Sequence, residues 1–417
     1  MFNISLLTIG DEICIGQVIN TNAAWIASKC TLLGANVIIH SSIGDNKKEM
    51  YKELNRLIPV SDLIIITGGL GPTHDDITKP VLTEYFNDKL VLHKETLEHL
   101  EKLFQLRGYK FTERNRNQAL LPSKAKLLFN NVGTAPGMLF EKGDKYIVSL
   151  PGVPAEMKSI MIDSVLPFIQ KTMAERLDEV ALYKTLHTTG TPESKLADMI
   201  GDPDIFMEGG TLAFLPSYRG VRLRIGIKAK SFDIAKEKLF HIESELNKRA
   251  GKFIFGSDEE SLVSKVGSLL GEKNKTVSVA ESCTGGLLGG EFTSVSGSSE
   301  YFSGGVIVYC NKAKEIVLGV GHETLKEFGA VSEQVAIELA ANVRKKFDTD
   351  YGIGITGIAG PTGGSEDKPV GTVWIGLADS NIAFAKKYVF GNDRDMNRER
   401  AVGTALAMLL KNLSDNI

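Results

Sequence analysis

The chain has 417 residues and carries 48 basic and 51 acidic side chains, which gives a formal net charge of -3 at pH 7. This near balance offers no electrostatic reason for nucleic acid or an anionic membrane to be the main partner, so we expect small-molecule partners. A hydrophobic fraction of 43% is ordinary for a globular protein, and the length predicts two or three domains.

Cellular location is predicted from three further features. No apolar run approaches the roughly 18 residues that a membrane-spanning helix needs, and the N-terminus MFNISLLTIG lacks a basic segment before its apolar stretch. The four cysteines are scattered without C-x-x-C spacing, which indicates reduced and mostly buried thiols rather than a zinc site. We therefore expect a cytoplasmic protein without a membrane partner.

Short apolar strands alternate with helical patterns over the first 170 residues. The segments are ISLLTIG, TNAAWIASKCTLLG, NVIIHSSIG, KKEMYKELNRLI and DLIIITGG. This alternation is typical of a parallel α/β sheet, in which ligands bind at the carboxyl ends of the strands. The segments that follow the strands are GDEICIG, GDN and TGGLGPTHDDIT, and we expect them to meet around one site.

Two glycine-containing loops indicate a phosphate site in this first half. Gly68, Gly69 and Gly71 follow the strand DLIII, and their backbone can approach a ligand closely and donate amide hydrogen bonds. The segment SLPGVPAEM, with Pro151 and Gly152, follows another strand and is expected to form a wall of the same pocket. An ordinary turn between a strand and a helix would also account for the second loop.

Carboxylates beside the first loop are candidate ligands of a hard divalent cation, because such ions prefer oxygen. Asp76 is the first candidate, and Asp45 in SIGDN is its expected partner. The alternative is that Asp75 or Asp76 caps a helix that begins near Ile77, with help from Thr78.

The segments GDEICIGQVINTN, TGGLGPTHDDIT and LPGVPAEM together resemble the N-terminal domain of the CinA (competence/damage-inducible) proteins, which is similar to the molybdopterin-binding fold. The resemblance implies a hydrolase that cleaves the pyrophosphate of ADP-ribose with a divalent metal. In molybdopterin-binding relatives the loop ends in Asp, then Ile or Val, then Thr, which matches Asp76 rather than Asp75. The residues alone predict phosphate and metal, whereas ADP-ribose comes only from the resemblance.

A small α+β unit is expected from residue 171 to 255. We predict a helix capped at Thr191 and Pro192, and strands in TLAFLPS and VRLRIGIKA. Arg222 and Arg224 alternate along the last strand and should share one face, which is either a nucleic-acid surface or simply a solvated face. The unit resembles a small KH-type module, and GSDEESLV is expected to link it to the rest of the chain.

The final segment, 256–417, reads as a second α/β unit that contains the unusual sequence AESCTGG. There Ser282, Cys283 and Thr284 stand at a strand end, before a helix expected to begin near Gly285. Backbone amides at such a turn can hold an anion, and a hydroxyl there can be a nucleophile whose oxyanion meets the same donors. Ser282 as a plain helix cap is the alternative, and the residues alone do not rank the serine above the cysteine.

A serine nucleophile needs a base, and no histidine stands near this motif. Lys312 and Lys314 follow the next strand in VIVYCNKAKEIVLG, beside Tyr309. A desolvated lysine can serve as a base, although both lysines could also be solvated helix charges.

The segments ESCTGG, GSSEYFSGGVIVYCNKAK, GAVS, GITGIAGPTGG and KPVGTVWIGLA resemble the CinA C-terminal domain, which is similar to the bacterial nicotinamide-nucleotide amidases. The resemblance implies hydrolysis of nicotinamide mononucleotide to nicotinate mononucleotide and ammonia, a step of pyridine-nucleotide salvage that needs no cofactor. It implies Ser282 as nucleophile and Lys314 as base, with Tyr309 also matching. Cys310 departs from the small hydroxyl residue common in relatives.

The resemblance also suggests how the nucleotide is bound. Thr284, Gly285 and Gly286 are the expected cradle for phosphate or oxyanion, and Arg394 is the expected contact to phosphate or carboxylate, with Arg398 as a substitute. A binding protein that senses nucleotides or acts as a scaffold in competence or DNA damage, with one or both sites inactive, is the alternative.

We thus expect an α/β protein with two α/β domains of mainly parallel sheets, joined by a small α+β KH-like unit. The expected boundaries are 1–170, 171–255 and 256–417. By the same resemblance we expect a homodimer.

Overall fold

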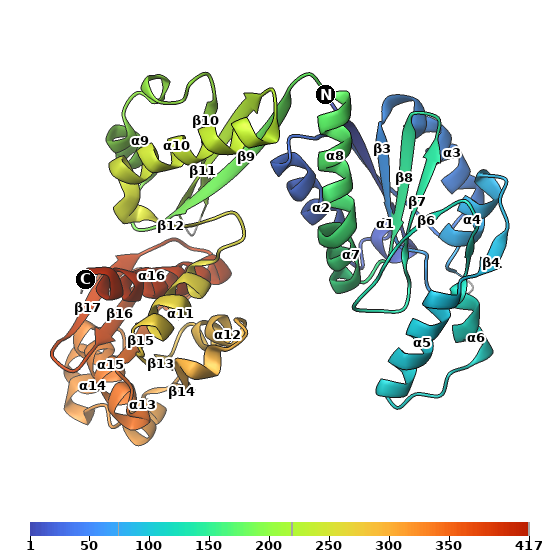
Figure 1. Cartoon of the computed structure of the whole chain (residues 1–417). Coiled ribbons are helices and arrows are strands. Elements are labelled where there is room, and N and C mark those ends of the chain that lie inside the picture. Colours follow the sequence, from blue (N-terminus) through green and yellow to red (C-terminus); the bar gives the residue numbers. More distant parts are fainter. Residues whose placement is uncertain (74, 218–219, 416–417) are drawn as a thin grey trace. The chain divides into compact units, whose positions relative to one another are not determined.

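The computed structural model of the chain describes residues 1–73, 75–217 and 220–415 (Figure 1). It divides into two compact units, Met1–Tyr183 with Gly226–Phe240, and Lys184–Ile225 with His241–Ile417. None of the helices in the described part of the chain is both long and apolar enough to span a membrane.

Unit 1 is built on a six-stranded sheet in the order β2-β1-β3-β8-β7-β6. The four strands β2, β1, β3 and β8 run parallel, and β7 and β6 extend the sheet antiparallel at one edge. Every residue of β3 is buried, as its unbroken aliphatic sequence predicts for a central strand. The strands are β1 Asn3–Ile9, β2 Asn36–Ile43, β3 Leu63–Thr67, β6 Lys126–Leu128, β7 Gly137–Lys142 and β8 Lys145–Leu150.

Helices cover both faces of this sheet, so unit 1 has three layers (Figure 1). One hydrophobic cluster contains the buried faces of α2, α7 and α8, and another contains those of α3 and α4. A short antiparallel pair, β4 and β5, lies outside the main sheet. The bounds are α1 Asp11–Cys14, α2 Thr21–Leu32, α3 Lys47–Leu57, α4 Thr78–Tyr85, β4 Leu90–Leu92, α5 Lys94–Leu106, α6 Glu113–Arg116, β5 Leu120–Pro122, α7 Pro154–Ile160 and α8 Leu166–Arg176.

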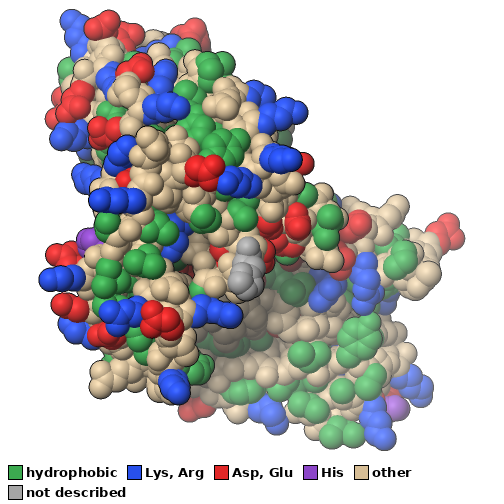
Figure 2. Space-filling view, turned by 90° about the vertical axis from the view of Figure 1, so that its right-hand side faces the viewer, with side chains coloured by type: hydrophobic (Ala, Val, Ile, Leu, Met, Phe, Trp, Pro, Cys, Tyr) green, Lys and Arg blue, Asp and Glu red, His purple; other side chains and the backbone are tan. Residues whose placement is uncertain are grey.

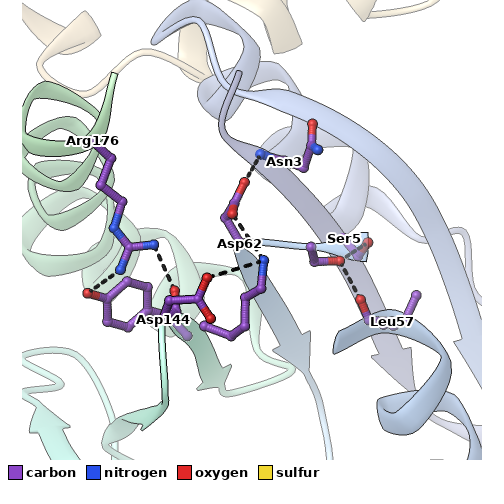
Figure 3. A network of polar contacts seen from close by, with 9 residues as sticks. Asn3, Ser5, Leu57, Asp62, Asp144 and Arg176 are labelled. Atoms are coloured by element: carbon purple, nitrogen blue, oxygen red, sulfur yellow. Dashed lines mark hydrogen bonds and ion pairs between the residues drawn. The ribbon is translucent and has the colours of Figure 1, made fainter. Parts of the chain in front are cut away.

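A polar network fixes the amino ends of the central strands (Figure 3). The Asp62 carboxylate accepts a hydrogen bond from the Asn3 amide at 2.7 Å, and Lys145 Nζ donates to the same carboxylate at 3.3 Å. Arg176 donates to the Asp144 carbonyl oxygen at 2.7 Å. These contacts hold one end of the sheet, and the opposite, carboxyl end carries the candidate site described below.

The small middle sheet has the order β10-β11-β9-β12. Arg222 and Arg224 are both exposed between buried neighbours, so the prediction that they share one face of β11 is confirmed. The predicted capping is confirmed for Pro192, which is the N-cap of α9, and wrong for Thr191, whose Oγ1 is buried without a hydrogen-bond partner among the described residues. The elements are β9 Val180–Thr188, α9 Glu193–Ile200, β10 Thr211–Ser217, β11 Gly220–Ala229, α10 Phe232–Ala250 and β12 Ile254–Ser257.

The last sheet has the order β14-β13-β15-β16-β17. The pairs β14-β13 and β13-β15 are parallel, and β15-β16 and β16-β17 are antiparallel. The predicted α/β class is confirmed, with parallel strands on one side of this sheet and antiparallel strands on the other. The elements are α11 Leu262–Glu272, β13 Val277–Glu281, α12 Leu287–Thr293, β14 Phe302–Ile307, α13 Asn311–Leu318, α14 His322–Phe328, α15 Glu333–Phe347, β15 Tyr351–Gly357, β16 Thr372–Ala378, β17 Ala383–Val389 and α16 Arg394–Asp415.

Glycines in β15 and β16 allow helix α15 to lie close to this sheet. A Cβ atom on Gly352 would come within 2.1 Å of the Ala340 carbonyl oxygen, and one on Gly376 within 2.2 Å of the Ala336 carbonyl oxygen. The alternating glycines Gly352 and Gly354 of YGIGITG therefore reflect close helix packing.

Charges of both signs are mixed on one face of the surface. On the face drawn in Figure 2, Lys and Arg side chains are interspersed with Asp and Glu side chains. This distribution agrees with the small net charge of the sequence.

Candidate functional site

The C-terminal sheet brings a serine and a lysine together. Ser282 follows the last residue of β13, and Lys314 lies in the first turn of α13, which follows β14. Lys314 Nζ lies 3.1 Å from Ser282 Oγ, and both side chains are buried. Because β13 and β14 are parallel neighbours, their carboxyl ends meet at one edge of the sheet, and this edge carries the pair.

Two backbone carbonyls fix the orientation of the lysine amine. Lys314 Nζ donates to the carbonyl oxygens of Val308 at 2.9 Å and Tyr309 at 3.1 Å. A neutral amine has two N–H donors and one lone pair, so in that form, with both N–H groups on these carbonyls, the lone pair would face the Ser282 hydroxyl. Burial lowers the pKa of Lys314, which favours this neutral form. Lys312 is exposed, so the structure brings only Lys314 of the two candidates to the serine.

Neither a Cys283 nucleophile nor a helix cap formed by Ser282 agrees with the structure. Burial raises the pKa of the Cys283 thiol to about 12, so at neutral pH it is a protonated, weak nucleophile. Helix α12 begins at Leu287 with Gly286 as its N-cap and no side-chain cap. The alternative that Ser282 serves only as a helix cap is therefore wrong.

The predicted anion cradle is not open at its two glycines. The buried carboxylate of Glu281 accepts hydrogen bonds from the amides of Gly286, Leu288 and Gly289, at 3.0, 3.1 and 2.8 Å. The Gly285 amide donates to the Ser282 carbonyl oxygen at 3.2 Å. The chain therefore supplies its own acceptors for these amides, and the role of Gly285 and Gly286 in holding phosphate or oxyanion stays a prediction.

Thr284 is fully buried, and Arg398 donates to its carbonyl oxygen at 3.1 Å. It is not among the described residues that line the pocket at the serine. Its predicted role in binding stays a prediction.

A small pocket of about 140 Å³ opens at the serine and lysine. Arg394 lines it and donates to the Gly360 carbonyl oxygen at 2.8 Å and to the Tyr309 hydroxyl at 3.3 Å. Arg398, the alternative, points instead to Thr284 and does not line this pocket within the described chain. The other lining residues are Cys283, Ala330, Val331, Thr356, Gly357 and Ala359.

A second, larger pocket of about 480 Å³ lies at the carboxyl end of the unit 1 sheet. Every site residue predicted for the first half of the chain lines this pocket. These are Asp45, Gly68, Gly69, Gly71, Asp76, Pro151 and Gly152. Three further carboxylates line it, those of Glu12, Asp75 and Glu156. Glu156 belongs to LPGVPAEM, the segment expected to form a wall of this pocket. Glu12 lies inside the quoted segment GDEICIG, and only the fold shows that it lines the pocket.

The glycine loop is braced by Asp76. Its Oδ1 accepts from the Gly71 amide at 2.7 Å, and its Oδ2 accepts from the Thr73 amide at 2.8 Å and the Thr73 hydroxyl at 2.5 Å. The cap alternative is wrong, since Ile77 is the N-cap of α4 and no side chain caps it. Each carboxylate oxygen can accept about two hydrogen bonds, so Oδ1 keeps capacity for a cation.

Negative charge is concentrated around Asp45. Its pKa is raised by burial and by the charges of Asp11, Glu12 and Asp75, partly offset by a hydrogen bond from the Asp11 amide. A cation in this pocket would relieve that repulsion. Over residues 1–73, 75–217 and 220–415, no three His, Cys, Asp or Glu side chains are close enough to form a metal site by themselves. A metal there would need ligands from the substrate as well, so metal binding by Asp45 and Asp76 stays a prediction.

Three families match successive parts of the chain. The family described as "Probable molybdopterin binding domain" matches residues 5–171, "Damage-inducible protein CinA KH domain" matches 183–256, and "CinA C-terminal domain" matches 259–413.

Full-length relatives are also found. A CinA-like protein of Flavobacterium psychrophilum is 42% identical over 99% of this chain and 99% of its own. A CinA-like protein of Salinibacter ruber is 41% identical over 98% of this chain and 99% of its own. Among solved structures, the competence/damage inducible protein CihA of Agrobacterium tumefaciens is 39% identical over 37% of this chain and 93% of its own, with a TM-score of 0.36.

Proposed function

We propose that this chain, which belongs to the CinA family, hydrolyses the carboxamide of nicotinamide mononucleotide in its C-terminal domain. The products are nicotinate mononucleotide and ammonia. The observation that carries the proposal is the buried Lys314 amine 3.1 Å from the Ser282 hydroxyl, held there by hydrogen bonds from Nζ to two backbone carbonyls.

The first half of the reaction acylates the serine. Lys314 accepts the hydroxyl proton while Ser282 Oγ forms a bond to the carboxamide carbon, which gives a tetrahedral oxyanion. Lys314 then returns the proton to the nitrogen, the C–N bond breaks, and ammonia leaves an acyl-serine. The Glu281 carboxylate accepts hydrogen bonds from the amides of Gly286, Leu288 and Gly289, so the amide of Cys283, which lines the pocket, is the candidate oxyanion donor.

The second half releases the acid. Lys314 takes a proton from a water molecule as its oxygen attacks the ester carbon, and it returns that proton to Ser282 Oγ as the ester bond breaks. Each proton passes through one amine, so no further base is required.

The volume of the pocket at Ser282 and Lys314 supports binding of the small nicotinamide ring inside it. A volume of about 140 Å³ is below the roughly 300 Å³ at which pockets begin to enclose drug-sized ligands, so it suits one ring with its carboxamide. The ribose and phosphate would remain at the mouth. Arg394 lines the pocket and carries a guanidinium suited to a phosphate.

The test is ammonia release from nicotinamide mononucleotide by the full-length protein. Ser282→Ala should lower kcat at least about 10³-fold, because the nucleophile is lost. Ser380→Ala, at an exposed serine outside this pocket, is the matched control and should retain wild-type turnover. Wild-type turnover by Ser282→Ala would refute the assignment.

A second activity is favoured by the unit 1 pocket. We propose that it cleaves the pyrophosphate of ADP-ribose with a divalent metal. The pocket is large enough for a nucleotide and combines glycine loops with five carboxylates. Mg²⁺ is typically bound by one or two carboxylates together with substrate phosphates, and here Asp45 and the free capacity of Asp76 Oδ1 would hold it. The metal would neutralise the phosphates and activate the attacking water.

ADP-ribose turnover with and without a chelator tests this second activity. Asp45→Ala should abolish the metal-dependent rate, and Asp144→Ala, an exposed carboxylate at the opposite end of the sheet, is the control. Binding without turnover in the wild-type protein would favour the sensor alternative.

A further inference from the structure

We propose that Val18, Ile19 and Val153 form an aliphatic clamp that holds a planar base of the ligand in the unit 1 pocket by its two faces. The inference rests on the proposed nucleotide activity of this pocket and adds where the base binds. It also predicts which chemical features of the base are recognised.

The three side chains line the pocket and yet are open to solvent. Ile19 is 85% exposed, Val153 is 54% exposed and Val18 is 50% exposed. Leaving large aliphatic groups in water is unfavourable, and exposed apolar groups at a pocket are typical of ligand-binding surfaces. Ile15, in the same loop, is 67% exposed but does not line the pocket.

Hydrogen bonds hold the clamp residues in place. The amides of Gln17 and Val18 donate to the Glu12 carbonyl oxygen at 2.9 and 3.2 Å, and the Thr21 amide donates to the Ile19 carbonyl oxygen at 2.8 Å. These contacts fold the segment between α1 and α2 back on itself. Its aliphatic side chains are therefore presented by an ordered loop.

Val153 lines the pocket from a second segment, and this segment is tied to helix α2. Val153 is the N-cap of α7 and directly precedes Pro154, whose ring restricts the backbone there. The Asn22 side-chain amide, in the first turn of α2, donates to the Gly152 carbonyl oxygen at 2.7 Å. This bond connects the two segments that carry the clamp and limits their separation.

The chemistry of the pocket differs along its lining. Asp45, Asp75 and Asp76 provide negative charge for a metal and its phosphates, whereas the clamp offers only methyl and methylene groups. A ligand that uses both regions has an anionic part and a flat apolar part, as a nucleoside diphosphate does. Because the clamp has no hydrogen-bonding groups, it holds the faces of the base and does not read its edge. We therefore expect adenine and hypoxanthine to be accepted alike.

Equilibrium binding with Mg²⁺ tests the clamp in the full-length protein, with ADP as a ligand that has a base and pyrophosphate as one that lacks it. Ile19→Ser and Val153→Ser should each weaken ADP about tenfold, since an apolar contact is lost, and leave pyrophosphate unchanged. Ile15→Ser is the matched control and should bind both ligands like the wild type. Inosine diphosphate should bind like ADP.

The outcomes separate this inference from the proposed activity. Wild-type protein that binds ADP through the clamp but does not cleave ADP-ribose would overturn the activity alone. Equal affinity of the wild type for ADP and pyrophosphate, or equal losses for both ligands in Ile19→Ser, would overturn the clamp. So would an Ile19→Ser variant that changes only the oligomeric state, which would identify the exposed rim as a contact between chains.

Discussion

Replacement of Lys314 by methionine tests the proposed amidase chemistry most directly. Methionine is an unbranched side chain of similar length, so it fills the buried channel that Lys314 occupies but carries no nitrogen. The substitution removes the only amine that lies 3.1 Å from the Ser282 hydroxyl among the described residues. It also leaves the carbonyl oxygens of Val308 and Tyr309 without this donor.

The expected loss follows from those contacts. A positioned general base contributes about 10²–10⁴-fold, so kcat should fall by that factor, equivalent to roughly 3–5 kcal/mol of transition-state stabilisation. A buried carbonyl that loses its donor costs about 1–3 kcal/mol, so the free energy of unfolding should fall as well. Thermal melting shows whether the variant is folded at the assay temperature.

The assay is ammonia release from nicotinamide mononucleotide across a range of pH. Only the neutral amine can accept the proton, so wild-type kcat/KM should rise with pH through the pKa of Lys314. Burial places that pKa below the value of an exposed lysine. The residual activity of Lys314→Met should not show this rise.

Lys312→Met is the matched control, because Lys312 is exposed two residues away and should keep the wild-type rate and pH profile. Folded Lys314→Met protein with wild-type kcat, or with the same dependence on pH, would refute Lys314 as the base. A loss in Lys312→Met of the size seen in Lys314→Met would refute the specific role equally.

Three further predictions concern packing and protonation. Gly376→Ala should lower the free energy of unfolding by about 1–3 kcal/mol in denaturant titrations, because the new Cβ would press on α15. Gly271→Ala is the control: this glycine of α11 has open space around it, so the free energy of unfolding should rise by about 0.5–1 kcal/mol. Similar effects of the two substitutions would contradict the close packing at Gly376. When native protein is treated with an alkylating reagent at neutral pH, mass spectrometry should find Cys310 modified and Cys283 unmodified until the protein unfolds. Cys310 is exposed, whereas burial raises the pKa of Cys283 to about 12. Alkylation of Cys283 in the native protein would contradict its burial. Burial raises the pKa of Asp350, but hydrogen bonds from Lys275 and Thr276 outweigh this effect, so the net shift of the pKa is downward. The carboxylate therefore stabilises the fold above the unfolded-state pKa, and this stabilisation is lost as pH falls through the folded-state pKa. Asp350→Asn should therefore lose about 0.5–1 kcal/mol at pH 7 and show less acid sensitivity, and a variant as stable as wild type at pH 7 would contradict this contribution.

The sequence predicted the α/β class because local pattern encodes it. The aliphatic run of β3 and the alternation of strands with amphipathic helices depend on residues close together in the chain. The glycine loops after β3 and β8 were identified in the same way. Gly68 illustrates the reason, since its φ of 100° and the Ile9 carbonyl oxygen 2.2 Å from a would-be Cβ leave no room for a side chain.

The family resemblance selected Ser282 and Lys314, but their proximity depends on tertiary structure. Parallel pairing of β13 and β14 brings residues 32 positions apart to hydrogen-bond distance. The burial that lowers the pKa of Lys314 comes from this packing, and the sequence motif does not show it.

Several side chains have partners that the sequence did not indicate. Glu281, inside the quoted motif, accepts hydrogen bonds from the amide of Gly286, which was expected to hold the substrate, and from the amides of Leu288 and Gly289. Asp76 braces its own loop instead of capping α4. A carboxylate can satisfy backbone donors or bind a ligand, and its residue type is the same in both cases.

The sequence by itself therefore determined the succession of strands, helices and glycine turns, and with them the loops where chemistry takes place. Only the tertiary structure decided which lysine meets the serine, which arginine lines the pocket, and which carboxylates face the ligand. The physical reason is that backbone conformation is largely set by neighbours in the chain, whereas hydrogen-bond partners, burial and pKa are set by atoms that folding brings together.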